Sequence, residues 1–140
     1  MKIFREYMNY SIESKDFYLS TPVSKSNKKP KGSISYDIKN SWIIGLKNTG
    51  YNDIAKYLET HTMSKPERMQ YLREIEKTKY KNLFSDMEKW WLDKLNRFIE
   101  VNNIQEIDYY SHYYDEITIK SSKKINSLMI DGIEFSKERN

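Results

Sequence analysis

The sequence predicts an α+β fold in which a central group of helices packs on an antiparallel sheet. Three observations carry this prediction. Residues 33–38 alternate apolar and polar side chains, residues 52–101 change to helical periodicity, and the period then returns to two. An Asp131-Gly132 pair between two β-rich runs predicts a hairpin near the end of the sequence. With 140 residues, we expect a single domain over residues 1–140 that buries a sizeable core.

The first part of the chain is expected to be extended up to residue 20, with strand candidates at Lys2–Tyr10 and Asp16–Ser20. Residues 21–32, TPVSKSNKKPKG, carry four lysines and no acid. This composition predicts a mobile, solvated hairpin tip that folding does not require, and a lysine finger that binds phosphates is the functional alternative. Residues 33–38 are expected to be a strand with one apolar face.

The middle of the chain begins with a short apolar run at residues 42–46. The run fits a buried strand or one helical turn, and its β-branched Ile43-Ile44 pair and Gly45 favour a strand beside residues 33–38. Asn52–Thr60 opens with a cap residue and an acid, which predicts a short helix.

Two capping boxes predict that residues 64–101 form two helices. Ser64 is followed three positions later by Glu67, with a proline in the first turn. A second box, from Ser85 to Glu88, allows a break near residues 82–85. One continuous helix over residues 64–101 is the alternative, and it would be long for a globular domain.

The helix over residues 83–101 is expected to be the core helix. At about 100° per residue, one stripe collects its large apolar side chains, which are Phe84, Met87, Trp91, Leu95 and Phe98. We expect Trp91, Leu95 and Phe98 to pack against the sheet. Trp90 lies at the edge of the stripe, so another element, a subunit or a partner must cover it.

Residues 109–120, YYSHYYDEITIK, are expected to be one extended strand with a tyrosine-rich, acidic face exposed to solvent. Such a face is typical of binding hot spots. On the same face His112 and Glu116 could act as acid and base in a metal-independent ribonuclease. The predicted partner-binding residues are Tyr110, His112, Tyr113, Tyr114, Asp115, Glu116 and Trp90.

Two basic sets are candidates for contact with a nucleic-acid backbone. The loop holds Lys25, Lys28, Lys29 and Lys31, and it accounts for the whole net charge of +4, because the other residues carry 20 basic and 20 acidic side chains. Arg73, Lys77 and Lys81 are spaced to stack on one helix flank. Residues 50–69 superficially look like a helix-turn-helix, although the glutamates of the second helix disfavour contact with DNA.

Composition excludes several kinds of site. The absence of cysteine removes disulfides and thiolate zinc sites, and two histidines are too few for a multi-histidine metal site. We find no glycine-rich phosphate loop, nucleophile elbow or metal motif, so we expect no cofactor and no metal, and we favour a binding protein over an enzyme. No run of 18 apolar residues and no signal-peptide pattern occurs, so we expect a cytoplasmic protein without a membrane partner.

Residue usage indicates the source. The 19 lysines against 5 arginines and the single alanine are what an AT-rich coding sequence produces, which suggests a low-GC bacterium, phage or mobile element. In composition the chain is similar to small accessory proteins of phages and mobile elements, including anti-CRISPR inhibitors of defence nucleases. This similarity implies a non-catalytic protein that binds and modulates a host protein or nucleoprotein complex. A helix-turn-helix-like regulator and a small ribonuclease are the alternatives.

Overall fold

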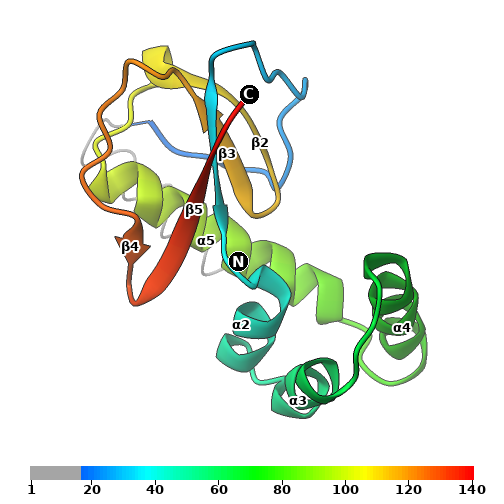
Figure 1. Ribbon diagram of the computed structural model, residues 1–140. Helices are drawn as coiled ribbons and strands as arrows, with labels where there is room; N and C mark the ends of the chain where they lie inside the picture. Colours follow the sequence, from blue (N-terminus) through cyan, green and yellow to red (C-terminus); the bar gives the residue numbers. More distant parts are fainter. Residues whose placement is uncertain (1–16) are drawn as a thin grey trace. The chain divides into compact units, whose positions relative to one another are not determined.

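The computed structural model describes residues 17–140, so the strand expected at Lys2–Tyr10 lies outside the described residues, and residues 17–20 form no strand. Along the chain, strands precede and follow a central group of helices, which confirms the predicted α+β class (Figure 1). The described residues form two compact units: the sheet unit, with residues 17–39 and 91–140, and the helical unit, with residues 40–90. The elements in chain order are β1 (Ile34–Ile38), α2 (Ser41–Asn48), α3 (Asn52–Thr60), α4 (Lys65–Thr78), α5 (Leu83–Val101), the 3-10 turn η1 (Glu106–Asp108), β2 (Tyr109–Tyr113), β3 (Glu116–Ile119), β4 (Met129–Ile130) and β5 (Ile133–Arg139).

The sheet has the strand order β2-β3-β1-β5-β4, and all neighbouring strands are antiparallel. The predicted strand β1 lies at its centre, between two strands from the C-terminal part of the chain. Ser35 of β1 faces Thr118 of β3, and their hydroxyl oxygens are 2.7 Å apart in a buried hydrogen bond. This hydrogen bond explains how the polar Ser35 is buried among the apolar residues of β1, because its hydroxyl is paired with that of Thr118.

The C-terminal part of α5 packs its predicted stripe on one face of the sheet. The Phe98 ring lies 4.6 Å from that of Phe135 on β5 and 5.2 Å from that of Tyr36 on β1. Trp91 and Leu95 are buried on the same side of the helix. The prediction that Trp91, Leu95 and Phe98 belong to the core is therefore confirmed.

The predicted hairpin at Asp131-Gly132 joins β4 to β5. Both turn residues have positive φ, 51° and 80°, as a two-residue type I′ turn requires. Arg97 of α5 holds this turn through Nε and one terminal nitrogen, each 3.1 Å from an Asp131 carboxylate oxygen. Strand β4 is shorter than the run expected at residues 125–130, and Ser127 closes its end by bonding the backbone N–H and C=O of Met129.

The strand expected at residues 42–46 is wrong, because this segment is helix α2 in the helical unit. Packing against the start of α5 overrides the local β propensity of Ile43 and Ile44. Trp42 meets Phe84 edge-on with ring centroids 5.3 Å apart. Gly45 is buried where a Cβ atom would lie 2.4 Å from Met87 Cε, so glycine permits the close approach of the two helices.

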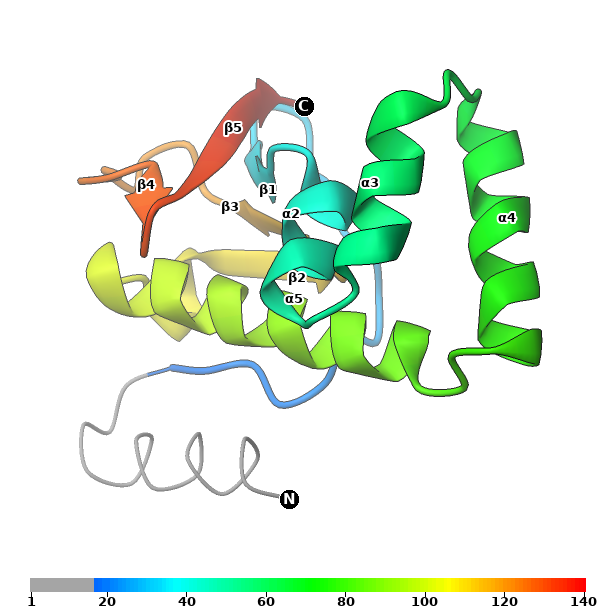
Figure 2. The ribbon, with the colours of Figure 1, turned by 90° about the horizontal axis from the view of Figure 1, so that it is seen from below.

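The remaining helices follow the sequence signals closely, and α3 has the predicted bounds. The first capping box is formed, with Ser64 Oγ accepting from the Glu67 N–H at 3.3 Å and the Glu67 carboxylate accepting from the Ser64 N–H at 3.2 Å. Residues 79–82 separate α4 from α5, which confirms two helices. Figure 2 shows α3 and α4 as an antiparallel pair.

The second capping box is not used, because α5 begins at Leu83, before Ser85. The carboxylate of Glu76, from the preceding helix, instead accepts a hydrogen bond from the Phe84 N–H at 2.9 Å. A side chain from outside the segment therefore satisfies one of the free N–H groups in the first turn of α5. Among the described residues, no helix is long and apolar enough to cross a membrane.

Candidate partner-binding surface

Residues 109–120 form a hairpin, which corrects the expectation of one continuous strand. Strand β2 ends at Tyr113, and Tyr114 takes a left-handed conformation with φ 54° before β3 begins at Glu116. The Tyr114 N–H donates to Pro22 O at 2.9 Å, and Asp115 O accepts from the Ile38 N–H at 3.2 Å. These bonds to distant segments fix a turn that the alternation of side chains does not reveal.

The two candidate catalytic residues point to opposite faces of the sheet. Tyr113 pairs with Glu116 and His112 pairs with Ile117, and successive strand residues alternate faces. The expectation that His112 and Glu116 share a face is therefore wrong. His112 is 5% exposed, with Nε2 2.7 Å from Thr21 O and Nδ1 2.6 Å from the Tyr109 hydroxyl.

Burial lowers the pKa of His112, because desolvation disfavours the imidazolium. Neutral His112 can donate from Nε2 to Thr21 and accept at Nδ1 from Tyr109. Glu116 lies in an ion pair with Lys29, with Nζ and a carboxylate oxygen 2.5 Å apart. Both groups are thus occupied within the fold, and their arrangement is that of structural residues.

The lysine loop, residues 21–32, runs along the outer edge of β2 and is not the tip of a hairpin. Val23 forms an isolated antiparallel bridge with Tyr113, and the Ser24 N–H donates to His112 O at 3.1 Å. Further along, the Ser111 hydroxyl donates to Lys28 O. The loop therefore covers backbone groups that an edge strand would otherwise expose.

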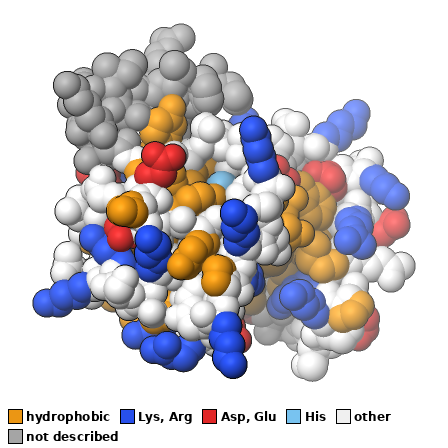
Figure 3. All heavy atoms as spheres, turned by 90° about the horizontal axis from the view of Figure 1, so that it is seen from above, with side chains coloured by type: hydrophobic (Ala, Val, Ile, Leu, Met, Phe, Trp, Pro, Cys, Tyr) orange, Lys and Arg blue, Asp and Glu red, His pale blue; other side chains and the backbone are white. Residues whose placement is uncertain are grey.

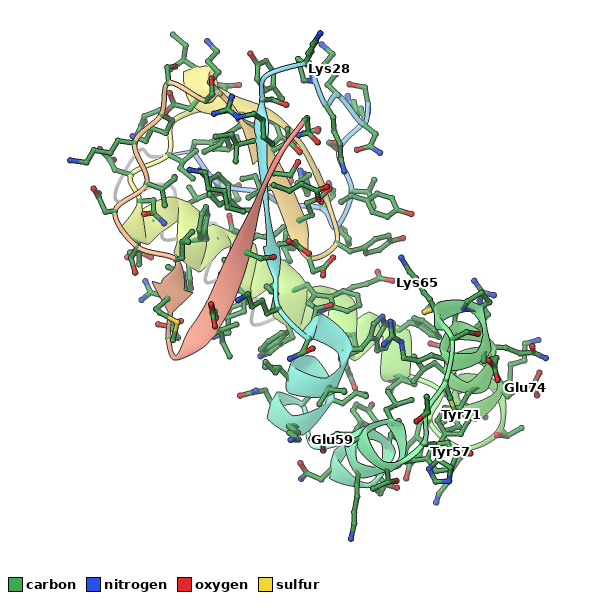
Figure 4. All side chains as sticks on the ribbon, viewed as in Figure 1. Lys28, Tyr57, Glu59, Lys65, Tyr71 and Glu74 are labelled. Atoms are coloured by element: carbon green, nitrogen blue, oxygen red, sulfur yellow. The ribbon has the colours of Figure 1, made fainter. Side chains whose placement is uncertain are left out.

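This arrangement brings two predicted sets together on one surface, which we name the loop–hairpin surface. Its members are the loop lysines and two residues of the hairpin: Lys25, Lys28, Lys29, Lys31, Tyr113 and Glu116. Figure 4 shows Lys28 projecting outward from the loop. On the face drawn in Figure 3, basic side chains stand around hydrophobic ones.

Within the loop–hairpin surface, charge and aromatic area are unevenly distributed. Lys29 is neutralised by Glu116, whereas the other three lysines are exposed and have no ion pair within residues 17–140. Tyr113 is 48% exposed, and its ring meets that of Tyr114 edge-on at 4.6 Å. The surface thus carries three uncompensated positive charges and one large exposed ring.

The other predicted partner-binding residues belong mainly to the fold. Tyr114 is half-buried with its ring 6.1 Å from that of Trp91, Tyr110 is half-buried on β2, and the Asp115 backbone holds β1. Trp90 lies in the helical unit, where its Cε3 would be 3.2 Å from a Cβ at Gly45. Helix α2 therefore supplies the second surface that the tryptophan pair requires.

The predicted basic row on α4 is interrupted. Arg73 and Lys77 are exposed on α4 and form no ion pair with any described residue, but Lys81 lies in the break after the helix. The three basic side chains therefore do not stack on one flank of a helix, as their spacing predicts.

Residues 17–140 contain no group of three or more His, Cys, Asp or Glu side chains that could hold a metal ion. Comparison with known proteins adds no further residue, because no family model, no curated protein and no solved structure matches the chain. Sequence reasoning missed Thr21 and Tyr109 as partners of His112 and Lys29 as partner of Glu116. No local signal marks Thr21 or Lys29, since both depend on how the loop returns to the sheet, whereas Tyr109 lies three residues from His112 on the same strand.

Proposed function

We propose that this protein is a non-catalytic binding protein that docks on a nucleoprotein or a nuclease and modulates it. The loop–hairpin surface is the proposed contact. One observation supports this most directly: the lysine loop lies along β2, because Val23 bridges Tyr113 and the Ser111 hydroxyl donates to Lys28 O, so exposed loop lysines lie beside the strand that ends at the exposed Tyr113.

Tyr113 is the proposed anchor of the interface. Tyrosines supply large contact area at low entropic cost and are enriched among residues that dominate binding energy. The Tyr113 ring contacts the Tyr114 ring, which in turn contacts the buried Trp91, so contacts that lead to the core fix the position of Tyr113. Because the loop already occupies the backbone edge of β2, a partner would bind through side chains and not by adding a strand.

The lysines define the chemistry of the partner. Three positive charges without an internal acid favour an anionic surface, either phosphates of bound nucleic acid or an acidic rim of a protein. Such charges act mainly on the rate of association, since they steer the encounter over a distance of about 10 Å at 0.1 M salt.

The test is a pull-down from a low-GC host, followed by association and dissociation rates against the captured partner. Reversal of Lys25 and Lys28 to Glu is expected to slow association by about tenfold and reduce its salt dependence. Reversal of Lys124 and Lys137, which are exposed and lack a described ion pair, gives the same charge change elsewhere and should alter the rate less.

Truncation of Tyr113 to Ala is expected to act on dissociation, with about a tenfold or greater increase in the rate. If the Tyr113→Ala variant and the Lys25→Glu, Lys28→Glu variant both bind the partner as wild type does, the loop–hairpin surface is not the contact.

Direct binding of nucleic acid is the second candidate function. The Lys29–Glu116 ion pair favours it, because the hairpin acid that would repel phosphates is neutralised. Retention of the isolated protein on nucleic acid, falling steeply with salt, would support this candidate. Binding that requires the partner protein would support the docking function instead.

A further inference from the structure

We propose that the helical unit carries a separate site for an unpaired nucleobase, built from the ring stack of His61, Tyr57 and Tyr71. A base of a single-stranded nucleic acid would stack on the exposed His61 ring, and basic side chains of α4 would meet its phosphate. This inference goes beyond the proposed docking function and uses none of the residues of the loop–hairpin surface.

The three rings form a ladder between α3 and α4. Tyr57 lies 3.9 Å from His61 with an interplanar angle of 18°, and 4.3 Å from Tyr71 with an angle of 15°. Two rings cannot occupy one face of a third at these distances, so Tyr57 is sandwiched. Figure 4 shows Tyr57 and Tyr71 lying together from the two helices.

The ladder is ordered yet open at one end. The His61 Nδ1 lies 2.9 Å from Tyr57 O and 3.1 Å from Thr60 Oγ1, so the ring is fixed by its own helix end. His61 itself is exposed, whereas Tyr57 and Tyr71 are half-buried. A fixed ring with an accessible face is what a stacking platform for bases needs, because little conformational entropy remains to be lost on binding.

The acids around the ladder are already engaged. Glu59 pairs with Lys47 at 3.0 Å, Glu67 accepts from the Ser64 N–H in the capping box, and Asp53 accepts from the Tyr80 hydroxyl at 2.5 Å. The ion pair neutralises Glu59, whereas the Glu67 and Asp53 carboxylates keep their charge because hydrogen bonding lowers the pKa of each, so the basic residues must outweigh these two charges at the phosphate.

Two basic residues of α4 are candidates for contact with the phosphate of the bound nucleotide. Lys65 opens α4 four residues after His61, is exposed and has no ion pair among residues 17–140. Arg68 lies one turn before Tyr71 on the same side of α4, and its Nε is buried without a hydrogen-bond partner in the part of the chain that the structure describes. Because this Nε is itself buried, a phosphate contact of Arg68 would be made by its terminal guanidinium nitrogens.

The experiment measures the affinity of the full chain for three fluorescent probes by anisotropy: a dT 8-mer, an abasic 8-mer with the same phosphates, and a double-stranded DNA of the same length. We expect the dT 8-mer to bind at least fivefold more tightly than either other probe. His61→Ala should weaken dT 8-mer binding by about 5- to 150-fold, the range expected for one stacked base. Lys65→Ala should weaken it more than the matched change Lys137→Ala on β5.

A second readout separates stacking from charge. Stacking of a base on the ring should move the proton resonances of His61 upfield through its ring current, and only two histidines contribute signals in this region. The Tyr113→Ala variant should bind the dT 8-mer as wild type does, so a failure of the docking function leaves this site intact. Equal affinity for the dT and abasic probes, or unchanged His61 resonances at saturation, would overturn the proposal.

Discussion

At the scale of single residues, buried polar side chains hold segments that lack regular structure. Asn102, which follows α5, is fully buried and donates to Phe98 O at 3.1 Å and Ser127 O at 3.0 Å. Its carbonyl accepts from the N–H groups of Asn126 and Ser127 at 2.7 and 2.8 Å. One amide thus satisfies backbone groups on both sides of the loop before β4.

Replacing Asn102 by Ala is expected to lower the free energy of unfolding by about 2–3 kcal/mol, because buried backbone groups lose their partners. Urea denaturation followed by circular dichroism measures the change. Asn126→Ala is the control, since it keeps the backbone N–H that Asn102 binds and removes only an exposed side chain. Equal effects of the two substitutions would contradict this role of Asn102.

His112 predicts a pH dependence of stability. Its pKa in the folded protein is lowered from the ordinary 6.5 by burial, so below pH 6.5 the unfolded chain binds more protons than the native one. The stability that neutral His112 contributes is complete above pH 6.5 and is lost as the pH falls toward the lowered pKa.

Between pH 7.5 and 5.5 we therefore expect the unfolding free energy of wild type to fall through this residue, by no more than about 1.4 kcal/mol, the limit for one such group over this interval. His112→Gln, which retains a donor for Thr21 O, should show a smaller loss over the same interval. Urea midpoints at both pH values provide the measurement, and parallel losses in the two proteins would show that His112 is not the titrating group.

At the scale of elements, the C-terminal part of α5 contributes buried large apolar side chains to the core of the sheet unit. Trp91→Ala should cost about 3–5 kcal/mol, since it removes a buried indole and leaves a cavity. Val101→Ala, an exposed position at the end of the same helix, should change stability by less than about 0.5 kcal/mol. Thermal denaturation compares the two, and a midpoint of Trp91→Ala within a degree or two of wild type would refute the assignment.

The lysine loop is expected to contribute to stability, in contrast with the expectation from sequence. Replacing residues 21–32 by a Gly/Ser linker removes the Val23 bridge and uncovers His112, so the thermal midpoint should fall by several degrees. Replacing only residues 25–27 keeps those bonds and should leave the midpoint nearly unchanged. Equal midpoints for both replacements would restore the view that the loop is dispensable.

Elements whose signals are local could be predicted from sequence. The capping box at Ser64, the Asp131-Gly132 turn and the stripe of α5 each involve residues within a few positions of one another. Helix α2 could not, because its apolar run fits two periods, and its packing against residues far along the sequence, such as Phe84 and Met87, is not visible in local periodicity. The turn at Tyr114 was missed for a similar reason, since its bonds reach Pro22.

At the scale of the whole molecule, the candidate site was predicted as residue types but not as an arrangement. Composition identified the lysine loop and the tyrosine-rich segment as separate features with different partners. The pairing of Lys29 with Glu116 and of Val23 with Tyr113 joins them, and such long-range contacts leave no trace in local periodicity. The prediction of a basic row on α4 was wrong for a different reason. Arg73, Lys77 and Lys81 are regularly spaced in the sequence, but Lys81 lies beyond the end of the helix.

Stability should also be unevenly distributed over the molecule. Among the residues of α4, Leu72 is the one that is buried, whereas four of the five residues of β1 are buried between two strands. Segments with few buried apolar side chains open locally at low cost. Amide hydrogen exchange should therefore be faster in α4 than in β1 by two or more orders of magnitude, and equal protection would indicate one cooperative unit.

The central position of β1 has a consequence for synthesis on the ribosome. Strand β1 pairs with residues 116–119 and 135–139, so it emerges long before either partner has been translated. At translation rates of about 5–20 residues per second, roughly 5–20 s pass between the synthesis of β1 and that of its second neighbour, β5. The four lysines directly before it place charge beside a segment that could pair with other nascent chains. The lysine loop would thus act as a gatekeeper during translation, before it folds along the edge of β2.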